Sequence, residues 1–215
     1  MIISPGRRYI LVHIPKTGGT ALSLALEARA RADDILIGDT PKARARRRRL
    51  AALTPRGRLW KHSTLADIEG VVAPDDLERY FVLTLVRNPW DRVVSYYHWL
   101  RAQGFEHPAV ALAKRHDFTR FLTEPWMQDS LRQASYGSYV TDSRGRERCR
   151  LFARIERLAE DLLPFEEHLG FRIGPVPRHN ESSRDRDYRI YYTDETRQIV
   201  AATAGKDIAR FGYNF

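Results

Sequence analysis

A chain of 215 residues is long enough to bury one substantial core, so we expect a single domain over residues 1–215 rather than two independent ones. Hydrophobic residues make up 43% and charged residues 29% of the sequence, which excludes an intrinsically disordered chain. The formal net charge of +9 predicts a surface that attracts anions, without deciding between nucleic acid, acidic polysaccharide, membrane and nucleotide.

The cysteine count and the hydropathy pattern limit where in the cell the protein is expected. Cys149 is the only cysteine, so neither an internal disulfide nor a thiolate metal cluster can form. The sequence has no run of 18 apolar residues and no apolar signal segment after Met1. We therefore expect a soluble protein in the cytoplasm.

The first predicted unit is a strand, a glycine loop and a helix. Residues 9–14 are apolar, residues 21–28 are strong helix formers, and between them stands Pro15-Lys16-Thr17-Gly18-Gly19-Thr20. A helix that begins after such a loop presents backbone N–H groups and the positive end of its dipole to an anion. The unit therefore predicts a phosphate-binding site.

The side chains of this loop suit the same ligand. Lys16 adds a full positive charge, the hydroxyls of Thr17 and Thr20 are donors, and Gly18 and Gly19 let the backbone approach closely. An ATP-type P-loop places its lysine after the glycines, which is the reverse of the order here. A nucleotide kinase or NTPase is thus the weaker alternative.

The middle of the chain is polar before it becomes apolar again. Residues 38–58 are expected to form a loop or a short exposed helix, whose Arg44 and Arg46–Arg49 either face solvent or bind an anionic ligand. Residues 59–62 are predicted to form a short strand ending at His62, with Thr64 as the N-cap of a helix over residues 65–69.

The strongest strand signal covers residues 80–86, which are β-formers without alternation and so predict a central strand. Arg87 follows this strand, where a Mg²⁺-dependent phosphotransferase would need an aspartate. Asn88 is predicted to cap the next helix, with Pro89 as its first residue.

The remaining elements complete an α/β pattern. We expect helices over residues 108–115, 118–122, 156–169 and 193–211, a strand over 150–155, and an irregular stretch that contains Trp126, Tyr136 and Tyr139. Strands followed directly by helices favour a P-loop-like three-layer fold, with a central, mostly parallel sheet flanked by helices.

Three segments resemble PAPS-dependent sulfotransferases of the carbohydrate type, which are related to heparan 2-O-sulfotransferases (PAPS is 3′-phosphoadenosine 5′-phosphosulfate). His13-Ile14-Pro15-Lys16-Thr17-Gly18-Gly19-Thr20 is similar to the family's 5′-phosphosulfate loop. The segment from Val86 to Tyr97 is similar to its 3′-phosphate motif, which implies that Arg87 and Ser95 bind that phosphate. The aromatic end, Phe211-Gly212-Tyr213-Asn214-Phe215, resembles the family's tail.

The resemblance implies PAPS as co-substrate and PAP as product, with transfer to a hydroxyl and without a metal. Sulfuryl transfer needs a cation at the departing phosphate and a base at the attacking hydroxyl, which we assign to Lys16 and His62. Glu27, Asp67 and Glu69 remain alternative bases, whereas His13, inside the first strand, is expected to be structural. The segment from Arg178 to Ser183 resembles one that lies near the nucleotide in the family.

The expected partner is a hydroxyl-bearing acceptor, a carbohydrate that can itself be anionic. Trp90, Trp99, Trp126 and Tyr136 suit packing on sugar rings, and they suit packing in a core equally well. A nucleic-acid-binding module is a further alternative that rests on charge alone, because the sequence carries no recognition motif for nucleic acid. We therefore expect no nucleic-acid partner and no transmembrane segment.

Overall fold

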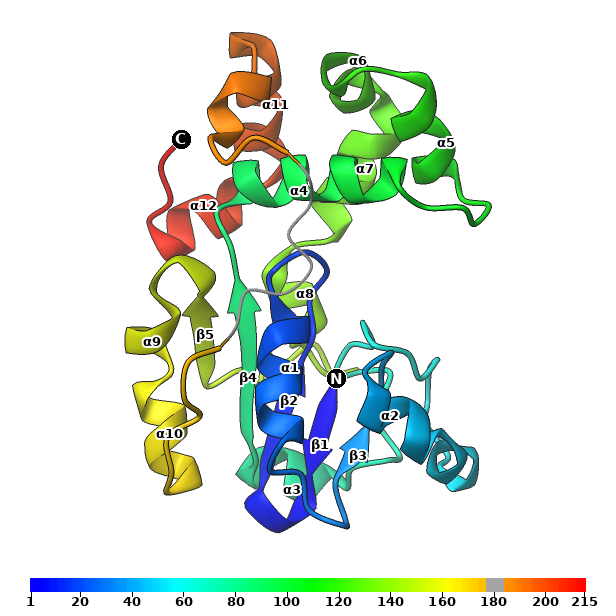
Figure 1. Ribbon diagram of the computed structural model, residues 1–215, viewed down its shortest axis with the longest axis vertical. Coiled ribbons are helices and arrows are strands. Elements are labelled where there is room, and N and C mark those ends of the chain that lie inside the picture. The colour runs from blue at the N-terminus through cyan, green and yellow to red at the C-terminus, as the bar shows by residue number, and fades with distance from the viewer. Residues whose placement is uncertain (177–183) are drawn as a thin grey trace. The chain divides into compact units, whose positions relative to one another are not determined.

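The computed structural model describes residues 1–176 and 184–215, which divide into two compact units (Figure 1). The first unit comprises the described residues of Met1–Val86 and Gly137–His179. The second comprises the described residues of Arg87–Tyr136 and Asn180–Phe215.

A five-stranded mixed sheet in the order β3-β1-β2-β4-β5 forms the centre of the first unit. Its strands are β1 (Ile2–Ser4), β2 (Tyr9–Val12), β3 (Ile35–Leu36), β4 (Phe81–Val86) and β5 (Leu151–Arg154). Strands β2, β4 and β5 are parallel, with Leu11 opposite Leu83 and Leu83 opposite Leu151, whereas β1 is antiparallel to β2 and β3. The predicted α/β class with parallel central strands is confirmed, and β4 is an interior strand as expected.

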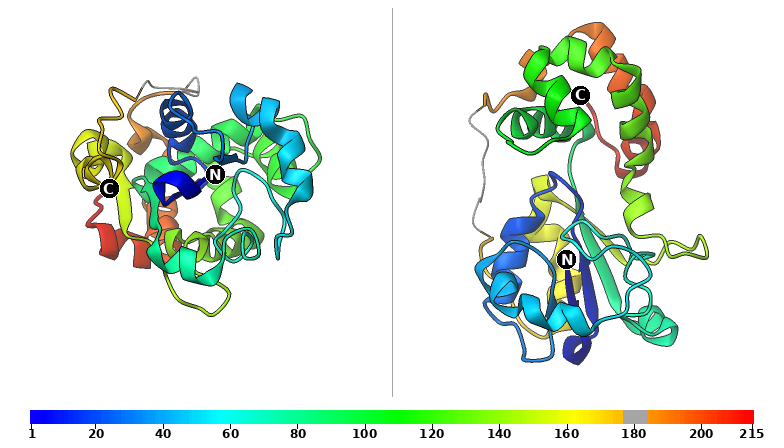
Figure 2. Two further views of the ribbon diagram at one scale, coloured as in Figure 1. Left: turned by 90° about the horizontal axis from the view of Figure 1, so that it is seen from below. Right: turned by 90° about the vertical axis from the view of Figure 1, so that its right-hand side faces the viewer.

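Both faces of this sheet are covered, because successive strand residues point to opposite sides. One face packs on α3 (Pro74–Arg79) and on residues 65–72 through Ile10, Val12 and Val82. The other face packs on α1 (Gly19–Glu27), α2 (Pro41–Arg46) and α10 (Leu163–Leu169) through Tyr9, Leu11 and Leu83. Figure 2 shows α1 and α3 on opposite sides of the strands, which gives the predicted three layers.

The second unit is helical. Its elements are α4 (Pro89–Arg101), α5 (Pro108–Arg115), α6 (Phe118–Thr123), α7 (Pro125–Gln133), α11 (Asp194–Thr203) and α12 (Gly205–Phe211). The core of this unit buries Trp90, Val94, Phe121 and Val200. Of the two roles considered for Trp90, packing on a sugar or packing in a core, the structure therefore shows the second. Among the described residues, no helix combines the length and apolar character needed to cross a bilayer.

The start of α4 confirms the predicted cap. The side chain of Asn88 accepts a hydrogen bond from the N–H of Trp90 at 3.0 Å, and Pro89 is the first helical residue. The proline suits this position because its fixed φ is helical and its missing N–H would have no intrahelical partner there.

The predictions for residues 59–62 and 65–69 were wrong. Residues 59–62 form a turn instead of a strand, because the buried Ser63 hydroxyl bonds the carbonyl oxygens of Arg58 and Trp60, each at 2.8 Å. Residues 65–69 form turns instead of a helix, with the Thr64 hydroxyl accepting from the Asp67 N–H at 3.2 Å. His62 therefore lies in a turn.

The predictions for three other segments were also wrong in part. The stretch around Trp126 and Tyr136 is not irregular but contains α7 and α8 (Tyr136–Tyr139). The helix expected over residues 156–169 is divided into α9 (Leu158–Asp161) and α10, because Pro164 lacks the N–H that would continue α9. The last helix is divided at Ala204, whose φ of −112° and ψ of 17° leave the helical region.

Phe165 tests the packing of the first unit. Its ring is fully buried, with centroids 5.1 Å from Tyr9 and 5.4 Å from Phe81. We predict that Phe165→Ala lowers the free energy of unfolding by about 3–5 kcal/mol, because it leaves a cavity. Leu163→Ala in the same helix is the control, since Leu163 is 47% exposed and should change stability by about 0.5 kcal/mol or less. Urea denaturation followed by circular dichroism measures both, and equal losses would contradict the assignment.

Candidate active site

The order of strands points to one edge of the sheet in the first unit. After β2 the next strand, β3, lies beyond β1, whereas after β4 the next strand, β5, lies on the opposite side. Ligands of open α/β sheets bind outside the carboxyl ends of strands where the connections diverge in this way. Thr84 ties the two strands together here, because its hydroxyl donates to the Val12 carbonyl at 2.9 Å.

The glycine loop follows β2 at this edge and has an unusual backbone. Lys16 has a φ of 65° and Gly18 a φ of 84°, both in the left-handed region. For lysine this conformation is uncommon and costs free energy, and such residues concentrate at functional sites. Gly18 caps the nine-residue helix α1, and no side chain bonds its first turn as a cap. The helix N-terminus therefore retains the donors that bind an anion.

Close packing explains why the loop needs two glycines. A Cβ atom on Gly18 would lie 2.4 Å from Cδ1 of Ile155, and one on Gly19 would lie 2.2 Å from Cδ2 of His13. The backbone of the loop thus rests on the His13 ring after β2 and on Ile155 after β5. A larger residue at either position would displace the start of α1.

The two threonines of the loop have different surroundings. Thr17 is fully buried, and its hydroxyl donates to the Ile14 carbonyl at 2.9 Å. This hydroxyl therefore stabilises the turn. Thr20, in the first turn of α1, is partly exposed.

His62 lies beside the same loop, on the other side of His13. The two imidazole centroids are 4.8 Å apart, and Nδ1 of His62 is 2.7 Å from the backbone oxygen of His13. Because a carbonyl oxygen only accepts, Nδ1 of His62 is the protonated nitrogen, and in the neutral imidazole Nε2 is then the basic nitrogen. The structure thus brings His62 and the Lys16 loop together around His13.

His13 is buried and neutral. Burial lowers the pKa of its imidazole well below 6.5, and the positive charges of Lys61 and Lys16 act in the same direction. With its ring against Gly19 and its carbonyl oxygen on His62, His13 has the structural position that the sequence predicted.

The three alternative bases are engaged elsewhere. Glu27 accepts from the Thr40 hydroxyl at 2.7 Å, and burial raises its pKa. Asp67 accepts from the Thr64 N–H at 2.7 Å. Glu69 accepts from the Ser143 hydroxyl at 2.6 Å, and this bond is the main cause of its lowered pKa.

Arg87 and Ser95 belong to the second unit. Nε and Nη2 of Arg87 are each 2.7 Å from Oδ2 of Asp91, at the start of α4. Ser95 lies one helical turn after Asp91 and therefore on the same face of α4. Ser95 is 5% exposed, so it is not an ordinary surface serine.

Sequence reasoning missed a second cation in this cluster. The guanidinium of Arg184 also bonds Asp91, through the other carboxylate oxygen. Among the described residues, two guanidinium groups thus share the carboxylate of Asp91, and guanidinium groups are suited to bind phosphate. The segment from Arg178 to Ser183 lies outside the described residues, so its predicted place near the nucleotide stays a prediction; its polar, arginine-bearing composition was the available signal for Arg184.

Two arginines of the run at residues 44–49 bond backbone carbonyl oxygens of the first unit. Arg46 donates to the Arg31 carbonyl at 2.7 Å and Arg49 donates to the Ala32 carbonyl at 2.6 Å. Arg44, Arg47 and Arg48 are exposed.

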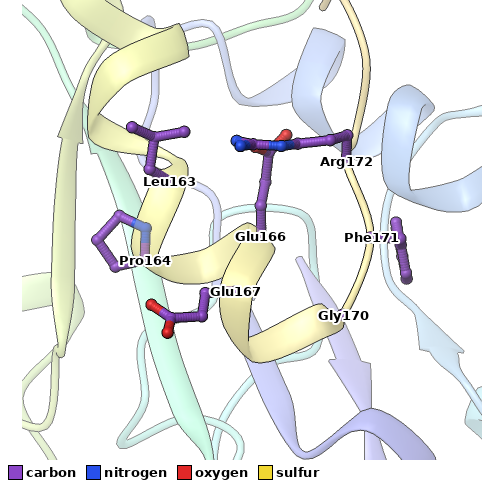
Figure 3. Close-up of a pocket in the computed structure, with 7 residues that line it drawn as sticks. All are labelled: Leu163, Pro164, Glu166, Glu167, Gly170, Phe171 and Arg172. Atoms are coloured by element: carbon purple, nitrogen blue, oxygen red, sulfur yellow. The ribbon is translucent and has the colours of Figure 1, made fainter.

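A surface hollow elsewhere in the first unit contains none of these residues. Its volume is about 620 Å³, and it is lined by α10 and the loop that follows, including Glu166, Phe171 and Arg172 (Figure 3). Arg172 pairs with Glu166 at 2.6 Å within the hollow, and Glu167 adds a second carboxylate to its lining. Outside residues 177–183, no three His, Cys, Asp or Glu side chains converge in a way that could hold a metal.

Comparison with known proteins gives a family and a fold. A family model described as "Sulfotransferase family" matches residues 1–214. No curated protein is similar enough in sequence to match the chain. Among solved structures, mouse sulfotransferase SULT7A1 complexed with PAP matches at 16% identity and a TM-score of 0.51, covering 91% of this chain and 83% of that one. At this identity the structural match shows that the two proteins share a fold.

The buried state of His13 predicts a pH dependence of stability. In the unfolded chain the imidazole regains a pKa of about 6.5, so below this pH the unfolded state binds more protons than the folded state. The free energy of unfolding should therefore fall as pH drops below about 6.5, and His13 contributes at most about 1.4 kcal/mol per pH unit.

We predict that His13→Gln reduces this slope, which urea denaturation at a series of pH values measures. The other titrating groups remain in both proteins, so the difference between the two slopes reports on His13. Identical slopes would show that His13 is protonated in the folded protein.

Proposed function

This chain belongs to the sulfotransferase family, and we propose that it transfers the sulfuryl group of PAPS to a hydroxyl of a carbohydrate acceptor. Family membership makes the chain an enzyme of sulfuryl transfer, as its sequence predicted. The observation that carries the proposal is the family match over residues 1–214, which includes both anion-binding motifs. The PAP bound to the mouse sulfotransferase of the same fold supports PAPS as the donor.

The loop from Lys16 to Thr20 has the features needed for the 5′-phosphosulfate of PAPS. Its left-handed residues turn the backbone into the start of α1, which no side chain caps. Glycine at positions 18 and 19 keeps this backbone free of side chains, so that an anion can approach it. We assign the binding of this end to Lys16, Thr17, Gly18, Gly19 and Thr20, with Thr17 contributing its backbone because its hydroxyl is buried on the Ile14 carbonyl.

Lys16 and His62 are the proposed catalytic residues. PAPS supplies an activated sulfuryl group whose departure leaves negative charge on the 5′-phosphate. Lys16 neutralises this charge as it develops. Nε2 of His62 takes the proton of the attacking hydroxyl, because the His13 carbonyl holds the proton of the imidazole on Nδ1. His13 is a positioning residue in this scheme.

Arg87 and Ser95 are proposed to bind the 3′-phosphate, and Arg184 joins them through Asp91. The carboxylate orients the guanidinium of Arg87 with two bonds of 2.7 Å. A phosphate can be gripped by two N–H groups of one guanidinium, which lysine cannot do. The position of both guanidinium groups on Asp91, one helical turn before the buried Ser95, supports this assignment.

We propose that residues 1–215 act as one catalytic domain, because the family model spans both units. The match also favours sulfuryl transfer over the kinase and nucleic-acid-binding alternatives. Cytoplasmic location and a carbohydrate acceptor are proposals that fractionation and an acceptor panel test.

The catalytic assignment predicts different defects for two variants. With labelled PAPS and a panel of neutral and acidic oligosaccharides, Lys16→Ala should lower transfer by about 100-fold or more. His62→Gln should lower transfer by about 100-fold or more while PAP affinity, measured by calorimetry, stays unchanged.

Lys114→Ala, which removes an exposed lysine of α5, is the control and should transfer at the wild-type rate. Full activity of both site variants would refute the assignment. Stabilisation by ATP with Mg²⁺ but not by PAP would instead favour the kinase alternative.

The role of Arg87 predicts a loss that depends on one phosphate group. Arg87→Gln should weaken PAP binding by about 10- to 100-fold, because a charge-assisted hydrogen bond is lost. Binding of 5′-AMP, which lacks the 3′-phosphate, should not change. Arg101→Gln at the other end of α4 is the control. An equal loss for both nucleotides would place Arg87 away from the 3′-phosphate.

A further inference from the structure

An exposed indole lies next to the proposed base. Trp60 is 42% exposed, and its ring centroid is 5.0 Å from that of His62, with the ring planes at 87°. Large aromatic side chains gain most from burial, so an exposed one beside a reactive group is suited to contact a ligand. A ring that packs on this indole would have its substituents within reach of the imidazole.

Hydrogen bonds from the buried Ser63 hold the turn that carries Trp60. Ser63 is fully buried, and its hydroxyl accepts the Trp60 N–H at 2.9 Å while lying 2.8 Å from the carbonyl oxygens of Arg58 and Trp60. The Ser63 N–H donates to the Trp60 carbonyl at 3.0 Å. These bonds involve the backbone of residue 60, so the position of the turn does not depend on the indole itself.

The surroundings of the indole are basic. The guanidinium of Arg58 lies 5.5 Å from the Trp60 ring centroid, and Arg58 is exposed. Two acids near this turn have partners: Asp39 pairs with Lys61 at 2.8 Å, and Asp67, beside Gly57, accepts from the N–H and hydroxyl of Thr64 at 2.7 and 2.9 Å. The Lys61 hydrogen bond is the main cause of the lowered pKa of Asp39, and Arg44 contributes to it through its charge. The field next to His62 therefore favours an anionic ligand.

We propose that Arg58 and Trp60 form the acceptor subsite and select an acidic sugar residue. The indole packs on the apolar C–H face of the sugar ring, and Arg58 binds its carboxylate or sulfate. This arrangement presents a neighbouring hydroxyl to Nε2 of His62. The inference rests on the proposed function, because it takes His62 as the base.

The test measures binding of oligogalacturonate and of its neutral methyl ester to the protein saturated with PAP. Wild-type protein should bind the acidic form more tightly. Trp60→Ala should weaken both forms by about 10-fold, since it removes the packing surface. Arg58→Gln should weaken only the acidic form, by about 10-fold, and so abolish the preference.

Two controls match these variants. Phe105→Ala removes an aromatic ring of the second unit that is 49% exposed, and Arg120→Gln removes an exposed arginine of α6. Neither should alter the binding of either sugar. A preference for the acid that survives Arg58→Gln, an equal loss in Phe105→Ala, or tighter binding of p-nitrophenol than of the oligosaccharide would overturn the proposal.

PAP binding by the same samples separates this inference from the function on which it rests. Both variants should bind PAP as the wild type does, because neither residue belongs to the donor site. A wild-type protein that does not bind PAP would overturn the proposed function. Binding of PAP without any binding of either oligosaccharide would overturn the acceptor subsite alone.

Discussion

The backbone of the glycine loop contacts the side chains of His13 and Ile155 so closely that positions 18 and 19 have no room for a Cβ atom. This contact sets where α1 begins, and therefore where the N–H groups of its first turn point. It also covers the His13 ring, and the His13 carbonyl oxygen in turn fixes the tautomer of His62. The glycine loop and His62, the residues of the proposed donor site and base, are thus positioned by one packing arrangement at the end of β2.

This arrangement costs stability. Lys16 adopts a left-handed backbone conformation that is unfavourable for a residue with a Cβ atom. His13 is kept neutral in a buried position among cations. The surrounding sheet offsets both costs, because β2 lies between two hydrogen-bonded neighbours and its side chains are buried on both faces. Strain next to the reactive centre is tolerated where the scaffold is rigid.

The arginines show why composition alone does not identify ligands. Arg46 and Arg49 bond backbone carbonyls, and Arg154 forms bonds of 2.8 and 3.0 Å to Asp161, so these side chains stabilise the fold. Arg87 and Arg184 instead share the carboxylate of Asp91. The difference lies in how many acids and carbonyls surround each guanidinium, which depends on the fold.

Several features of this protein could be predicted from its sequence, because they depend on residues that are neighbours in the chain. The strands at residues 9–14 and 80–86, the Asn88 cap, the glycine loop and the candidate residues Lys16, Arg87 and His62 follow from hydrophobic runs, backbone preferences and short motifs. The tertiary structure decided what depends on partners distant in sequence: the turn at residues 59–62, the burial of Ser95, the contact of Arg184 with Asp91 and the place of Trp60 beside His62. A hydrogen bond or ring contact between distant residues leaves no periodicity in a chain, because its geometry exists only after the strands and helices have packed.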